Sequence, residues 1–101
     1  MPAVIEFTLQ AKPGHYDEVK DKYIAFADAF VQAQPEEEFA LITGDAASGT
    51  IRGIGVFDNW QAGADANSLA SFAAFMDSIE GLITGPPTRT EMDLVHVYVR
   101  Q

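Results

Sequence analysis

Apolar and polar residues alternate from position 3 to position 10, which is typical of a half-buried β-strand. One set of positions holds Ile5, Phe7 and Leu9, and the other is mostly polar. A Lys-Pro-Gly turn at 12–14 follows. From there the apolar residues recur at intervals of three and four, which predicts an amphipathic helix. That helical stripe consists of Tyr16, Val19, Tyr23, Phe26 and Phe30.

Two further strands and a second helix are expected after Pro35, which ends the first helix. Residues 36–38 are three successive glutamates, and we interpret this run as a solvated connection rather than a site. Residues 39–43 and 51–57 have strand patterns, and the small, turn-forming residues between them predict an antiparallel hairpin. The second helix is indicated by the stripe Leu69, Phe72, Met76, Ile79 and Ile83, and it ends before Gly85-Pro86-Pro87.

The closing strand, expected over residues 91–100, has apolar side chains on both faces. One face holds Met92, Leu94, His96 and Tyr98, and the other holds Val95, Val97 and Val99. A strand with one solvated face would alternate apolar and polar residues. Since two helices can cover only one face of a sheet, we expect a second copy of the chain to cover the other face.

The expected order is strand, helix, strand, strand, helix, strand. With short connections and right-handed crossovers, this order predicts an α+β fold: a ferredoxin-like, four-stranded antiparallel sheet with both helices on one face. Two such sheets stacked through their bare faces form a dimeric α/β barrel. A length of 101 residues fits a single domain over 1–101.

Composition and charge exclude several classes of protein. Fifteen acidic and six basic residues give a net charge of -9, which disfavours binding to nucleic acid or to an anionic membrane. Cysteine is lacking, so disulfide scaffolds, thiol nucleophiles and cysteine metal sites are excluded. The chain shows no run of about 18 apolar residues and no secretory pattern at its start. We therefore expect a cytoplasmic protein without a membrane partner.

Turn and packing residues in four segments carry a resemblance to a known family. They are Ala11-Lys12-Pro13-Gly14 with Tyr16-Asp17-Glu18-Val19, then Val56-Phe57-Asp58-Asn59-Trp60, the helix at 72–82, and Gly85-Pro86-Pro87 before a valine-rich strand. Together these segments resemble the antibiotic-biosynthesis monooxygenase family of dimeric α/β-barrel proteins. The resemblance implies a homodimer whose protomers each hold an apolar cleft between sheet and helices. In active members, cofactor-independent oxidation of electron-rich aromatic compounds takes place there. Other members degrade haem, and many have no assigned function.

The haem-degrading pattern is not present in this sequence. The resemblance would require an Asn on the first strand, where Phe7 takes the inward-looking position, and a Trp and a His on the second helix. Residues 69–83 contain neither His nor Trp. Two histidines far apart in the sequence do not form a transition-metal ligand set. We therefore expect no haem, flavin or metal cofactor.

His96 and Arg52 are candidate catalytic residues. Imidazole titrates near neutrality, so His96 could accept a proton, although a hydrogen-bonded role at the dimer interface is the favoured alternative. Arg52 is a lone positive charge on a strand and could hold an acidic or phenolate ligand. It could equally pair with Glu6 or Glu91 across the sheet.

Trp60, Asn59 and Tyr23 are candidate ligand contacts. Trp60 follows a strand end, where it could stack on a flat ligand or anchor the passage to the second helix. Asn59 could donate to a carbonyl or a developing oxyanion, and its alternative is a turn residue. Tyr23 lies on the buried helical stripe, so its hydroxyl needs a partner in the ligand or the backbone.

Two glycines, Gly53 and Gly55, lie on the same face of one strand, where glycine is disfavoured. Either another element approaches closely at these positions, or the floor of a pocket opens beneath the helices. The second alternative would place the ligand between sheet and helices.

These observations favour a protein that binds a small apolar, aromatic or polyketide-like molecule. It would oxidise this molecule as a cofactor-independent monooxygenase, with Asn59, Trp60, Arg52 and His96 as catalytic candidates. Substrate-binding candidates are Tyr23, Phe7, Phe72 and Met76. The alternatives are a non-catalytic ligand-binding or stress-related dimer, and a purely structural dimerisation module.

Overall fold

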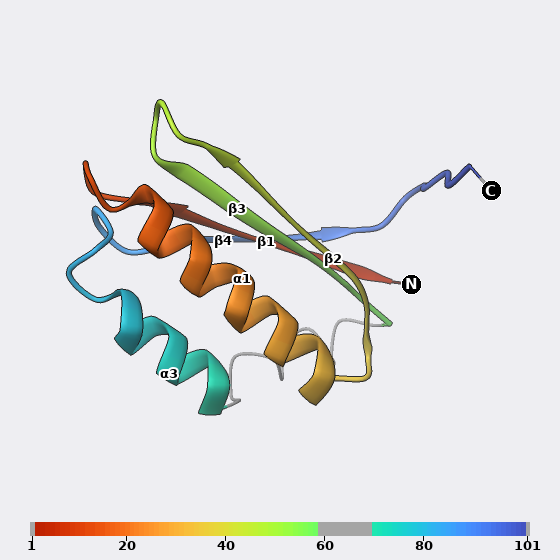
Figure 1. The fold of residues 1–101 in the computed structure, drawn as a ribbon. Helices are drawn as coiled ribbons and strands as arrows, with labels where there is room; N and C mark the ends of the chain where they lie inside the picture. The colour runs from red at the N-terminus through yellow and green to blue at the C-terminus, as the bar shows by residue number, and fades with distance from the viewer. Residues whose placement is uncertain (1, 59–69, 101) are drawn as a thin grey trace.

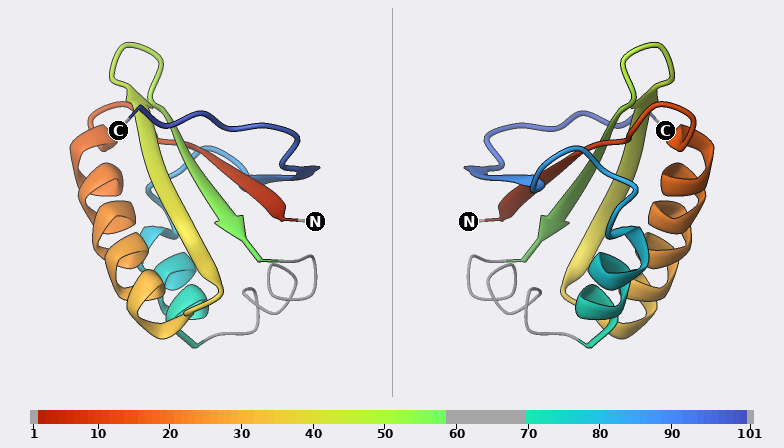
Figure 2. Two further views of the ribbon diagram at one scale, coloured as in Figure 1. Left: turned by 90° about the vertical axis from the view of Figure 1, so that its right-hand side faces the viewer. Right: turned by 90° about the vertical axis from the view of Figure 1, so that its left-hand side faces the viewer.

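A computed structural model describes residues 2–58 and 70–100 of the chain. Its elements are β1 (Ala3–Gln10), α1 (Tyr16–Ala33), β2 (Glu37–Asp45), β3 (Thr50–Phe57), α3 (Ala70–Ile79) and β4 (Thr88–Asp93). The four strands form one sheet in the order β2-β3-β1-β4, and all neighbours are antiparallel. Both helices lie on one face of this sheet (Figures 1 and 2). The predicted α+β, ferredoxin-like fold is confirmed.

Strand alternation assigns residues to the two faces of the sheet. In β1 and β3 the odd-numbered residues point toward the helices, because Leu9 pairs with Ile51 and both side chains are fully buried. Val19 of α1 and Ile79 of α3 close the same cluster from above and are also fully buried. The even-numbered residues of β1 and β3 therefore form the open face, which no helix of the described chain covers.

Aromatic rings hold the two helices together. Phe26 of α1 stacks on Phe75 of α3 with ring centroids 4.6 Å apart and planes inclined by 13°. The expected stripe of the second helix did not include Phe75, although it is one of the buried core residues. No helix in the described part of the chain is both long enough and apolar enough to cross a membrane.

The second helix ends earlier than the sequence pattern suggests. Gly81 adopts a positive φ of 83°, a conformation that terminates helices, so α3 stops at Ile79. Ile83 leaves the helix and forms an isolated bridge with Ala11. The start of the expected stripe, Leu69, lies outside the described residues.

The expected closing strand over residues 91–100 is wrong in its bounds. The strand β4 covers Thr88–Asp93 instead, because its pairing partner β1 runs out at Ala3, opposite Asp93. The last backbone bond runs from the amide of Leu94 to the carbonyl of Pro2 at 3.1 Å. Beyond it the chain projects away from the sheet as an extended tail (Figure 1). The tail valines are exposed, and Val95 reaches 89%.

Candidate functional site

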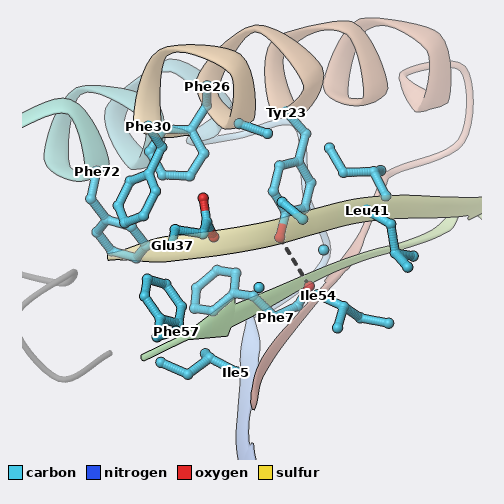
Figure 3. Close-up of a pocket in the computed structure, with 15 residues that line it drawn as sticks. Ile5, Phe7, Tyr23, Phe26, Phe30, Glu37, Leu41, Ile54, Phe57 and Phe72 are labelled. Carbon is cyan, nitrogen blue, oxygen red and sulfur yellow. Dashed lines mark hydrogen bonds between the residues drawn. The ribbon is translucent and has the colours of Figure 1, made fainter. Parts of the chain in front are cut away.

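A cavity of about 80 Å³ lies between the helices and the sheet, and it is open on one side. Its walls are mainly aromatic and aliphatic (Figure 3). The lining residues are Ile5, Phe7, Tyr23, Phe26, Ala27, Phe30, Glu37, Ala40, Leu41, Ile42, Gly53, Ile54, Gly55, Phe57 and Phe72. Tyr23 and Glu37 carry the polar side-chain atoms in this lining set. An apolar enclosure with a few convergent polar groups is the usual form of a small-molecule site.

Tyr23 reaches from α1 across the cavity to the sheet (Figure 3). Its hydroxyl donates a hydrogen bond of 3.2 Å to the backbone carbonyl of Phe7. Gly53 makes this approach possible, since any Cβ at that position would collide with the Tyr23 hydroxyl. Burial raises the pKa of Tyr23 above the ordinary range, and the charge of Glu37 acts in the same direction, while the Gly53 backbone acts against it. Tyr23 is therefore a neutral phenol at physiological pH.

Glu37 is the first residue of β2, and its side chain is directed into the cavity (Figure 3). A bulge between Glu37 and Phe39 places Glu37 opposite Phe57, on the helix side of the sheet. Gly55 leaves room for the carboxylate, because a Cβ there would lie 2.5 Å from Oε2 of Glu37. Burial raises the pKa of the Glu37 carboxyl from its ordinary 4.5 to about 7.

The interpretation of residues 36–38 as a solvated connection is thus wrong for Glu37. The bulge turns its side chain under α1, and it becomes part of the cavity wall. Glu38 is exposed, and its pKa is raised by a hydrogen bond to Asp58. The two neighbouring glutamates therefore differ in burial, since Glu37 is half-buried in the cavity wall and Glu38 is exposed.

Three of the expected substrate-binding residues line the cavity: Phe7, Tyr23 and Phe72. The rings of Phe7 and Phe72 meet edge to face with centroids 5.5 Å apart, so β1 and α3 contact each other at this wall. Met76 packs against the core cluster one turn further along α3, outside the set of lining residues.

Arg52 and His96 are not among the residues that line the cavity. Arg52 is exposed on the open face, between Thr8 and Thr43 on the neighbouring strands. One of its expected ion-pair partners, Glu91, pairs with Arg89 at 3.0 Å.

His96 is exposed in the tail after β4. The catalytic candidates Asn59 and Trp60 lie outside the described residues.

Both alternatives for Gly53 and Gly55 hold at once, because each glycine accommodates a close polar side chain and each lines the cavity floor.

The fold is shared with several solved structures. The "Putative antibiotic biosynthesis monooxygenase from Nitrosomonas europaea" matches with a TM-score of 0.84 and 10% identity, over 94% of this chain and 91% of that one. A structure with the same description from Deinococcus radiodurans matches with a TM-score of 0.81 and 18% identity, over 98% of each chain. SnoaB, a cofactor-independent oxygenase from Streptomyces nogalater, matches in a mutant form with a TM-score of 0.77 and 14% identity, over 95% of each chain.

The sequence matches no protein-family model, and no curated protein matches it. At these identities the structural likeness establishes the fold. The resemblance noted from turn and packing residues is thus confirmed as a likeness of fold to proteins described as antibiotic biosynthesis monooxygenases.

Proposed function

We propose that this protein binds a small apolar aromatic compound in the cavity and oxygenates it with dioxygen, without metal, flavin or haem. The observation that carries the proposal is the composition of the cavity wall. Phe7, Phe26 and Phe72 contribute aromatic faces and edges, and Tyr23 with Glu37 adds a phenol and a carboxyl of near-neutral pKa. The fold shared with a cofactor-independent oxygenase supports the same reading.

The chemistry needs a substrate anion that dioxygen can oxidise. An apolar wall excludes water and holds a flat ring in place, while polar groups within the cavity stabilise or exchange a proton with the substrate. Trp60 and Asn59 stay in the proposal as ligand contacts, because they follow Phe57, a lining residue, by only a few positions in the sequence.

Oxygen uptake tests this function directly. Purified protein is incubated with a panel graded in size, from hydroquinone with one ring to anthrone with three, and uptake is compared with that of each compound alone. We expect protein-dependent uptake that Ala27→Leu abolishes, since Ala27 lines the cavity and the larger side chain fills it. Ala25→Leu is the matched control, because Ala25 is exposed on the same helix. Uptake that is unaffected by Ala27→Leu would place the reaction elsewhere.

The cavity volume favours a second candidate function, a non-catalytic ligand-binding or stress-related dimer. About 80 Å³ is roughly half of the ~150 Å³ engineered cavity that holds benzene. A flat ligand must therefore extend through the open side. Saturable quenching of Trp60, the only tryptophan, by these compounds without oxygen uptake would support this candidate instead.

We also propose that the protein is a homodimer through the open face of the sheet. One row across that face is entirely apolar and comprises Met92, Val4, Val56 and Phe39. Phe39 is 54% exposed and Met92 38%. A polar row at the other end comprises Thr88, Thr8, Arg52 and Thr43. A contiguous apolar area beside polar residues is typical of a protein interface.

The tail after β4 carries further exposed apolar side chains. Val97, Tyr98 and Val99 are all mostly exposed in the single chain, although valine and tyrosine favour sheets. Cover by a second copy would bury them together with the open face. We assign Arg52 and His96 to this interface.

A further inference from the structure

We propose that Glu37 is the residue of the cavity that accepts a proton from a bound aromatic ligand. The proposal rests on the proposed oxygenase function and names the residue that accepts the proton in it. It starts from the position of the carboxylate in the cavity wall.

The chain keeps space for the Glu37 carboxylate. The bulge after Glu37 turns the side chain toward the helices, and Gly55 omits the one Cβ that would lie 2.5 Å from Oε2. Phe26 and Phe30 of α1 enclose the same volume from above (Figure 3). Glu37 is half-buried, and its carboxylate lines the aromatic cavity, where a bound ligand with a hydrogen to donate can reach it.

The groups around Glu37 favour a carboxyl that can both take and return a proton. From α1, Tyr23 faces it in the cavity and Asp28 lines the adjoining groove, and Asp58 follows β3 beside Glu38. These groups are neutral or acidic, so none of them holds Glu37 as a carboxylate. Burial places its pKa near neutrality, where a general base works best.

The Glu37 carboxylate takes the proton of a substrate C–H, and the electron pair of that bond stays on the carbon. Dioxygen accepts two electrons from this carbanion and forms a C–O bond, which gives a peroxide anion. The Glu37 carboxylic acid returns its proton to the peroxide. At a CH₂ centre, loss of one water leaves a ketone, so R₂CH₂ and O₂ give R₂C=O and H₂O.

Tyr23 is a positioning residue in this arrangement. Its hydroxyl donates its hydrogen to the Phe7 carbonyl at 3.2 Å, so that hydrogen is not offered to the ligand or to Glu37. A neutral Tyr23 beside Glu37 adds no positive charge that would hold the carboxyl ionised. The reacting hydrogen is therefore expected to lie nearer to Glu37 than to Tyr23.

Hydrogen exchange under nitrogen tests the proton transfer separately from oxygenation. Anthrone and 2-indanone, which carry CH₂ groups next to an aromatic ring, are incubated in D₂O with the protein, and loss of the CH₂ signal is followed by NMR. We expect protein-dependent exchange with at least one probe, and a loss of about 100-fold or more in Glu37→Gln. Gly55→Ala should also slow exchange, because the added Cβ displaces the carboxylate.

Glu38→Gln is the matched control, since Glu38 is the exposed neighbour of Glu37 on the same strand, and it should leave the exchange rate unchanged. Exchange without oxygen uptake would support Glu37 and defeat the oxygenase function. Oxygen uptake that persists in Glu37→Gln would support the oxygenase function and defeat the assignment of Glu37 as its proton acceptor. Exchange by neither probe, or exchange that Glu37→Gln does not slow, overturns the assignment of Glu37.

Discussion

The Tyr23 hydroxyl donates its hydrogen to the backbone carbonyl of Phe7, 3.2 Å away, and thereby ties α1 to β1 across the cavity. Tyr23 is at the same time a wall of that cavity and a member of the buried core. One side chain thus sets the distance between helix and sheet at the place where a ligand would bind.

Removing this hydroxyl should lower stability modestly. In Tyr23→Phe the carbonyl of Phe7 loses its donor, while the ring keeps its contact with Phe75 at 5.2 Å between centroids. We expect a loss of about 1 kcal/mol in the free energy of unfolding, measured by denaturant titration. An unchanged midpoint would show that water satisfies the carbonyl equally well.

Gly53→Ala should be more disruptive than Gly55→Ala. The new Cβ at Gly53 meets the hydroxyl and ring of Tyr23, which is buried in the core, whereas the Cβ at Gly55 first meets the movable end of Glu37. We expect Gly53→Ala to cost about 1–3 kcal/mol of unfolding free energy, the range of overpacked cores. In a Tyr23→Leu background that cost should shrink, which a double-mutant cycle measures. A cost independent of the residue at position 23 would contradict the contact.

Sequence periodicity was sufficient to predict the order and type of the helices and strands. The alternation at Ile5, Phe7 and Leu9 gave β1 with its observed bounds, and the stripe from Tyr16 to Phe30 gave the buried face of α1. The end of β4 could not be predicted in the same way. Valine alternation continues past Asp93, but the strand can extend only as far as β1 offers backbone partners.

The role of Glu37 could not be predicted from the strand pattern. Counting back by two from Ile42 and Ala40 leads to Glu38, so simple alternation assigns Glu38 to the helix side. The bulge inserts one residue and places Glu37 opposite Phe57, on the helix side. Phe7, Phe72 and Tyr23 were accessible to prediction because their positions follow from regular periodicity alone.

Glu37 should make stability fall as pH rises from about 4.5 to about 7. Its pKa is higher in the folded chain than the ordinary 4.5, so the folded state binds more protons than the unfolded state within this window. The favourable contribution is complete below about 4.5 and is lost as the pH passes 7. We expect Glu37→Gln to gain stability relative to the wild type on going from pH 5 to pH 8, measured by urea unfolding. A difference that does not change with pH would contradict a raised pKa.

The proposed dimer should dissociate when a charge is placed in the apolar row of the open face. Phe39 is 54% exposed in the single chain, so Phe39→Asp should leave the protomer folded while burying an unpaired carboxylate in the interface. We expect a monomer by sedimentation equilibrium at micromolar concentration. Ala25→Asp adds the same charge on the exposed side of α1 and should remain dimeric.

Truncation after Leu94 tests the contribution of the tail to self-association separately from that of the sheet face. The amide of Leu94 makes the last backbone bond of this edge, to Pro2, so a chain ending there keeps every β1–β4 pairing. Since residues 95–100 are exposed in the single chain, we expect the circular dichroism spectrum of the fold to persist and self-association to weaken at least tenfold. Analytical ultracentrifugation over a concentration series measures this change. Unaltered association would confine the interface to the sheet face and leave the exposed valines of the tail without a role in it.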